Sequence, residues 1–246
     1  MSGETVCMVK GEMIMKKYQT LLFDVDDTLL DFAAAEALAL NLLFESRNIS
    51  PTKEMEESYK KINQRLWSLF EEGKISRDEV INTRFSLLFK EMDQLVDGVL
   101  LEKNYRGYLE EGHQLINGAF ELVSALQNHY ELYIVTNGVS KTQDRRLRDS
   151  GLHPLFKEIF VSEDTGFQKP MKGFFDHVFD RIPNFSPEQA LIIGDSLSSD
   201  IKGGQLAGLD TCWFNPNAKS NNTGILPTYE IQDLNELYTI LNLEQR

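Results

Sequence analysis

The stretch Phe23-Asp24-Val25-Asp26-Asp27-Thr28, near the start of a chain of 246 residues, decides the fold. Its acidic part, from Asp24 on, follows directly on a short apolar run that ends at Phe23. This run does not alternate with polar residues. Such a run is typical of a strand buried on both faces, as in a parallel sheet covered by helices. An acidic turn after that strand would lie at the carboxyl edge of the sheet, where open α/β sheets bind ligands.

Four further apolar runs of the same kind follow later in the chain. The five runs are Thr20-Leu21-Leu22-Phe23, Leu132-Tyr133-Ile134-Val135, Ile159-Phe160-Val161, Leu191-Ile192-Ile193 and Thr211-Cys212-Trp213-Phe214. Helical patterns separate the later runs, which indicates βαβ units. The sequence therefore predicts an α/β fold with a doubly wound, Rossmann-like parallel sheet.

The first two runs are about 110 residues apart, which is far too long for one crossover helix. The intervening sequence is helical in pattern: its apolar residues recur at spacings of three and four, and Ser76 with Glu79 forms a capping box. We expect an inserted all-helical cap domain over residues 32–112. The catalytic α/β core would then comprise residues 16–31 and 113–246, after a disordered or non-native leader at residues 1–15.

The composition limits the partners of the protein. A net charge of -13 argues against binding to a nucleic-acid polymer, because such binding relies on Lys and Arg. No stretch approaches the ~18 apolar residues of a membrane span, and residues 1–14 lack the apolar segment of a secretory signal. With two cysteines, Cys7 and Cys212, in unrelated settings, we expect a cytoplasmic protein with no disulfide and no membrane partner. The oligomeric state stays open.

Polar residues follow the predicted strands at the same edge of the sheet. They are Asp24, Asp26 and Thr28 after the first run, Thr136-Asn137-Gly138 after the second, Lys169 after the third, and Gly194-Asp195 with Asp200 after the fourth. Each placement alone is also typical of an ordinary turn or helix cap. Their common position favours a single site, because the carboxyl ends of parallel strands converge on one crevice.

Carboxylates gathered in one site need cations to remain ionised. Lys169 would provide one positive charge, and the excess of Asp indicates a hard, oxygen-seeking ion, best Mg²⁺ with Mn²⁺ as a substitute. A lysine and a divalent ion beside an ionised Asp suit phosphoryl transfer, in which two anions must meet. The expected substrate is therefore a small phosphorylated molecule.

This ordered set of motifs resembles that of the haloacid dehalogenase superfamily of phosphohydrolases. The predicted helical insert also resembles the cap domain of that superfamily. The resemblance implies that Asp24 is the nucleophile that forms an aspartyl-phosphate, and that Asp26 is the general acid and base. Thr136 and Lys169 would bind the phosphoryl group, with a further contact from the Asn137 backbone N–H. The metal ligands would be the Asp24 side chain, the Asp26 carbonyl and Asp195, with Asp200 near the ion or orienting Lys169.

A closer resemblance is to the bacterial pyrimidine 5'-nucleotidases, which are associated with clearing non-canonical pyrimidine nucleotides. It is carried by residues 23–32, by Ser162-Glu163-Asp164-Thr165-Gly166-Phe167-Gln168-Lys169-Pro170, and by Tyr229-Glu230-Ile231 with Leu234 and Leu237. The sequence departs from these relatives at Met171-Lys172-Gly173, where they often have a small and an acidic residue. The resemblance implies a nucleoside 5'-monophosphatase with a preference for pyrimidines.

Other classes of function remain as alternatives. A phosphatase of sugar phosphates or a phosphoglycomutase of the same superfamily would use the same motifs, although short sugar mutases usually have Gly near Val25. A phospho-receiver domain also groups acidic residues, Thr and Lys around Mg²⁺, but it has no helical insert. A binding protein with a dead site is disfavoured because Asp24, Asp26, Lys169 and Asp195 are all present.

Overall fold

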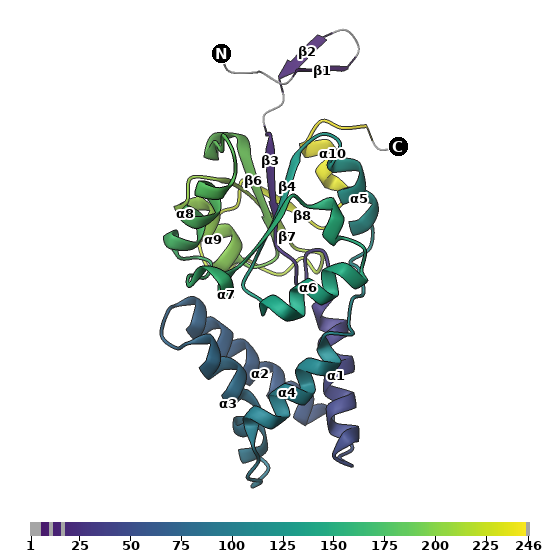
Figure 1. Cartoon of the computed structure of the whole chain (residues 1–246), viewed down its shortest axis with the longest axis vertical. Helices are drawn as coiled ribbons and strands as arrows, with labels where there is room; N and C mark the ends of the chain where they lie inside the picture. Colours follow the sequence, from purple (N-terminus) through teal and green to yellow (C-terminus); the bar gives the residue numbers. More distant parts are fainter. Residues whose placement is uncertain (1–5, 10–11, 16–17, 245–246) are drawn as a thin grey trace. The chain divides into compact units, whose positions relative to one another are not determined.

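Six parallel strands form the sheet of the α/β unit (Figure 1). The computed structural model describes residues 6–9, 12–15 and 18–244. The strands are β3 (Thr20–Phe23), β4 (Glu131–Thr136), β5 (Glu158–Val161), β6 (Ala190–Gly194), β7 (Asp210–Phe214) and β8 (Tyr229–Ile231). All five apolar runs lie in strands, so the predicted fold class is confirmed.

The strand order β5-β4-β3-β6-β7-β8 places β3 in the middle of the sheet. The chain builds β4 and β5 on one side of β3 and then crosses to β6 on the other side. Phe23 pairs with both Ile134 and Ile193, so the three central strands end at nearly the same level. This reversal of strand order opens the crevice in which doubly wound folds bind their ligands.

Helices cover both faces of the sheet, which explains why its strands are apolar throughout. Figure 1 shows α8 (Lys172–Arg181) and α9 (Lys202–Leu206) on one side and α5 (Ala119–Leu126) and α10 (Glu236–Ile240) on the other. The core under α8 contains Leu22, Tyr133, Val135, Phe160, Ile192, Phe174, Phe175 and Val178. The short elements of this unit are η1 (His153–Leu155), α7 (Ser162–Thr165), η2 (Pro187–Gln189) and η3 (Leu197–Ile201).

Four longer helices form a second, all-helical unit. They are α1 (Phe32–Ser46), α2 (Lys53–Glu71), α3 (Arg77–Lys90) and α4 (Gly98–Leu109). The predicted capping box opens α3: the Glu79 N–H donates to Ser76 Oγ at 3.2 Å, and the Ser76 N–H donates to Glu79 Oε2 at 2.7 Å. These bonds satisfy N–H groups that have no partner inside the helix.

The described residues divide into two compact units, one of residues 31–114 and 139–150, the other of the described residues up to 30 together with residues 115–138 and 151–244. The helix α6 (Ser140–Asp149) thus groups with α1–α4, although it follows a strand of the sheet. Arg146 of α6 donates from Nε to the Gly112 carbonyl at 2.6 Å, inside the helical unit. The limits expected for the cap domain, residues 32–112, stay a prediction.

The predicted leader falls partly outside the described residues. Of its residues 1–15, two short strands are described, β1 (Val6–Val9) and β2 (Glu12–Met15), and they pair in antiparallel fashion. Residues 1–5 and 10–11 lie outside the described part. Among the residues that the structure describes, no helix combines the length and apolar character needed to span a membrane.

A buried ionic network joins the helices of the all-helical unit. Arg84 donates to both carboxylate oxygens of Glu102 at 2.8 Å and to Asn63 Oδ1 at 3.1 Å. Asn63 in turn donates to Glu36 Oε1 at 3.0 Å, and Arg106 pairs with the same Glu102. Arg84 is 2% exposed and Glu102 4%, so removing one partner would leave the other charge buried.

We therefore expect Arg84→Met to lower the free energy of unfolding by about 3–5 kcal/mol, the usual cost of breaking a buried pair from one side. Urea unfolding followed by circular dichroism would measure it. The control Arg148→Met removes the exposed pair of Arg148 with Asp144 and should leave the unfolding midpoint unchanged. Equal effects of the two substitutions would contradict a stabilising role for the network.

Candidate active site

The acidic loop after β3 is held by main-chain hydrogen bonds. The Asp24 N–H donates to the Ile193 carbonyl of β6 at 2.9 Å, which continues the sheet by one residue. The Val25 carbonyl then accepts from the N–H groups of Thr28, Leu29 and Leu30. Asp27 has a φ of 57°, a left-handed conformation that Asp adopts more readily than most residues. The turn therefore fixes Asp24 at the carboxyl edge of the sheet.

Lys169 lies almost fully buried beside Asp24, at 1% exposure. Its ammonium donates to Asp24 Oδ1 at 2.7 Å, to Asp200 Oδ1 at 2.6 Å and to the Val135 carbonyl at 2.6 Å. These three acceptors use the three N–H donors of the ammonium. Burial acts to lower the pKa of Lys169, but Asp200 and Asp24 act against it and hold that pKa above its ordinary value. The lysine is therefore a fixed positive charge.

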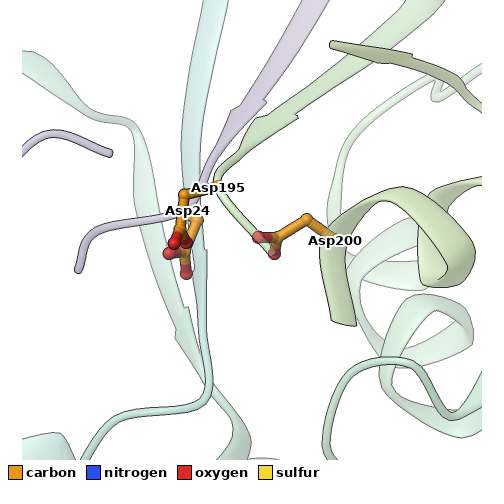
Figure 2. A group of neighbouring side chains, drawn as sticks. All are labelled: Asp24, Asp195 and Asp200. Atoms are coloured by element: carbon orange, nitrogen blue, oxygen red, sulfur yellow. The ribbon is translucent and has the colours of Figure 1, made fainter. Parts of the chain in front are cut away.

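Three carboxylates gather around this lysine. Oxygens of Asp24, Asp195 and Asp200 all lie within 4.8 Å of one another. Figure 2 shows the Asp24 and Asp195 side chains next to each other, with the Asp200 carboxylate pointing toward them. Three carboxylates thus gather around the buried ammonium of Lys169, and Lys219 also acts on Asp195 through its charge.

Burial, together with the crowding of the carboxylates, raises the pKa values of two of these groups. Burial raises the pKa of Asp24 to about 8; Lys169 opposes that rise, and Asp200 and Asp26 add to it. Burial, Asp200 and Asp24 also raise the pKa of Asp195 well above its usual range. An additional cation would keep both groups ionised at neutral pH. The cluster offers carboxylate oxygens, which hard divalent cations prefer, so it fits such an ion.

Gly194 makes room for the third carboxylate. A Cβ atom at this position would lie 2.2 Å from Asp200 Oδ2, which no side chain could tolerate without displacing Asp200. The same Oδ2 accepts from the Ser196 N–H at 3.0 Å. With Lys169 on Oδ1, both oxygens of Asp200 are held in place.

The last residue of β4 and the loop that follows it lie next to the lysine. Thr136 is 1% exposed, and its hydroxyl accepts from the Gly138 N–H at 3.1 Å. The Asn137 side chain donates from Nδ2 to the Lys169 carbonyl at 2.9 Å, and its Oδ1 accepts from the Lys169 N–H at 2.9 Å. The structure therefore brings two of the predicted segments into direct contact.

Asp26 is half-buried, and its carboxylate is not part of the close group of three carboxylates in the described residues. It is nevertheless near enough to Asp24 to raise the pKa of that group. This separation leaves the two aspartates of the loop in different surroundings.

Sequence patterns do not predict two contacts of the site. The Trp213 indole donates to the Asp195 carbonyl at 2.8 Å, and the Val135 carbonyl accepts from Lys169. Trp213 belongs to an apolar strand and is 4% exposed, so its sequence context indicates only a core residue. No spacing along the chain signals either contact, because both depend on how the strands pair.

Residues 21–214 match the family of haloacid dehalogenase-like hydrolases. The match spans the sheet from β3 to β7 together with the helical insert and includes every residue of the site. The chain belongs to this family.

A close relative shares nearly the whole chain. YfnB of Bacillus subtilis, described as a putative hydrolase of the same family, is 69% identical over 230 residues, which cover 94% of this chain and 98% of YfnB. A crystal structure of YfnB bound to magnesium superposes with a TM-score of 0.90 at 68% identity, covering 93% of this chain and 100% of that one. Family and fold therefore agree over the full site.

Two further relatives carry a named activity. The pyrimidine 5'-nucleotidase PynA of Streptococcus pneumoniae is 42% identical over 226 residues, 92% of this chain and 95% of PynA. The pyrimidine 5'-nucleotidase YjjG of Escherichia coli is 31% identical over 225 residues, 92% of this chain and 98% of YjjG. With the family match, these relatives make the chain a phosphoric monoester hydrolase.

Proposed function

We propose that the protein is a magnesium-dependent phosphomonoesterase that acts through an aspartyl-phosphate on nucleoside 5'-monophosphates, with a preference for pyrimidines. The observation that carries the catalytic part is the position of Lys169, whose ammonium bonds both Asp24 and Asp200 at the carboxyl edge of the sheet. The two named nucleotidase relatives support the substrate. The alternatives within the family are a sugar-phosphate phosphatase and a phosphoglycomutase.

In the proposed reaction, an Asp24 oxygen attacks phosphorus and forms a new O–P bond while the bond to the substrate alkoxide breaks. Asp26 gives its proton to the leaving alkoxide. Asp26 then takes a proton from water, which attacks phosphorus, releases phosphate and restores Asp24. The different surroundings of Asp24 and Asp26 suit these separate roles.

The phosphoryl group that is transferred needs positive charge and hydrogen-bond donors around its oxygens. We assign this to Lys169, to the Thr136 hydroxyl and to the Asn137 backbone N–H. Mg²⁺ would be held by Asp24, Asp195 and the Asp26 carbonyl, with Asp200 near the ion or bound through water. When bound, it supplies charge neutralisation at the phosphoryl oxygens. Because Asp200 also bonds Lys169, it would orient that lysine as well.

A panel of phosphomonoesters tests the substrate. We expect kcat/KM for UMP, dUMP and dTMP to exceed that for AMP, GMP and sugar phosphates by more than about tenfold, or ~1.4 kcal/mol of transition-state discrimination. If sugar phosphates were preferred by that margin, the nucleotidase proposal would fail while the phosphatase chemistry stood. Transfer of phosphate to a sugar phosphate in place of water would indicate the mutase.

A further inference from the structure

The side chain of Asn137 makes two hydrogen bonds, both with the main chain of Lys169. Its Nδ2 donates to the Lys169 carbonyl and its Oδ1 accepts from the Lys169 N–H, each at 2.9 Å. The two residues are 32 positions apart, on the loops that follow β4 and β5. The amide therefore ties these two loops together at the lysine.

Lys169 is consequently fixed at both ends. Its ammonium is held by Asp24, Asp200 and the Val135 carbonyl, and its backbone is held by Asn137. A shift of the Lys169 backbone would change the distance over which its side chain must reach these three acceptors, so the anchor at the main chain helps to fix the ammonium. With the amide engaged in this way, the Asn137 backbone N–H remains the group assigned to the substrate.

We propose that Asn137 is a positioning residue, whose side chain sets the place of Lys169 and acts on catalysis through it. The proposal rests on the proposed function, in which Lys169 stabilises the transferring phosphoryl group. A displaced Lys169 stabilises the transition state less well, and the loss is larger there than for the bound substrate, because the interaction with the transferring phosphoryl group is strongest in the transition state. Removing the amide should therefore reduce kcat more than it raises KM.

The same pattern recurs elsewhere in the α/β unit and provides a matched control. Asn215 follows β7, donates from Nδ2 to the Lys219 carbonyl at 3.0 Å, and accepts from the Lys219 N–H at 2.8 Å. It makes one further bond, to Glu230. Asn215→Ala thus removes the same two bonds and one more, from the main chain of an exposed lysine whose charge acts on Asp195 and is kept in the variant. Any general effect of losing such a pair on folding should be at least as large there.

We expect Asn137→Ala to lower kcat by about 10- to 100-fold with KM changed by less than about threefold, because a displaced Lys169 weakens the transition state more than the bound substrate. Asn215→Ala should keep kcat within about threefold of the wild-type value. Orthovanadate, which imitates the transition state, should bind more weakly by the same factor as kcat falls. Inorganic phosphate should lose less than about threefold in affinity. If the alanine variant does not fold, Asn137→Ser can replace it. The serine side chain is too short to reach both Lys169 groups, so this variant should show the same changes in kcat, KM and vanadate affinity.

A double substitution separates action through Lys169 from direct contact with substrate. Adding Asn137→Ala to Lys169→Met should weaken vanadate binding, measured by calorimetry, by less than about twofold beyond Lys169→Met alone. If the losses of vanadate affinity from the two substitutions added in the double variant, the proposal would be overturned in favour of direct substrate contact. The same would follow if KM and the dissociation constant of phosphate rose in Asn137→Ala by the factor by which kcat falls. Wild-type kcat in Asn137→Ala would overturn it too. Absence of phosphomonoester hydrolysis by the wild-type protein would instead contradict the proposed function itself.

Discussion

Asp24→Asn should abolish turnover, with a loss on the order of 10⁴-fold or more, as for removal of other catalytic nucleophiles. An amide is nearly isosteric with the carboxylate and can still accept from Lys169, so the loop should keep its structure. It cannot form a phosphoryl bond at a useful rate, because it carries no negative charge. Hydrolysis of p-nitrophenyl phosphate at saturating Mg²⁺ measures the loss, and mass spectrometry of the quenched wild-type enzyme should find phosphate on Asp24.

The matched control is Asp27→Asn, the same chemical change three residues further along the same loop. Asp27 has a positive φ, which Asn tolerates well, so this variant should keep most of the wild-type turnover. Undiminished hydrolysis by Asp24→Asn would rule out Asp24 as the nucleophile. Phosphorylation followed by slow self-dephosphorylation, with no turnover of esters in the wild-type protein, would favour the receiver alternative.

The strands are predictable from the sequence to the extent that they are buried on both faces. The five apolar runs need no alternation, because helices cover both sides of the sheet. The edge strand β8 (Tyr229–Ile231) is not predicted as a strand, because it has only three residues and Glu230 is exposed. Short edge strands contain few apolar residues, so their extended conformation depends more on pairing with the adjacent strand than on their own sequence.

Helix α6 shows a second limit of sequence patterns. Its sequence is mostly polar, and its position after β4 suggests an ordinary crossover helix of the core. It groups instead with the helical unit, where Arg146 contacts Gly112, and Lys141 and Arg145 pair with Glu110. These contacts join residues about thirty positions apart or more along the chain. No local periodicity encodes them.

For the candidate site, the sequence is sufficient to predict which residues lie together at this edge of the sheet but not which atoms are in contact. Strand ends place Asp24, Lys169, Asp195 and Asp200 at one edge, because parallel strands share that edge. Which atom meets which depends on strand register and loop shape. Shared family motifs do not indicate, for example, that the Trp213 indole holds the Asp195 carbonyl. Such supporting contacts come from long-range packing.

Removal of divalent metal should abolish turnover completely, and Mg²⁺ should restore it. Without a bound metal ion, Lys169 and Lys219 are the cations that act on these three carboxylates, and burial, together with the neighbouring carboxylates, raises the pKa values of Asp24 and Asp195. An uncharged Asp24 is no nucleophile, and an uncompensated cluster repels a phosphate dianion. Dialysis against EDTA followed by titration with Mg²⁺, and separately with Mn²⁺, measures the dependence through p-nitrophenyl phosphate hydrolysis.

Metal binding can also be followed without turnover, because the Trp213 indole donates to the carbonyl of Asp195. In a Trp67→Phe background, Trp213 is the single tryptophan of the chain, and its fluorescence should change on addition of Mg²⁺. The midpoint of that change should match the midpoint of activation. Asp195→Asn should weaken both by at least about tenfold, since it removes one charged ligand, whereas Asp180→Asn, an exposed change on α8, should alter neither. Activity that survives chelation, with fluorescence insensitive to Mg²⁺, would show that the cluster works without a metal and that Lys169 alone balances the phosphoryl charge.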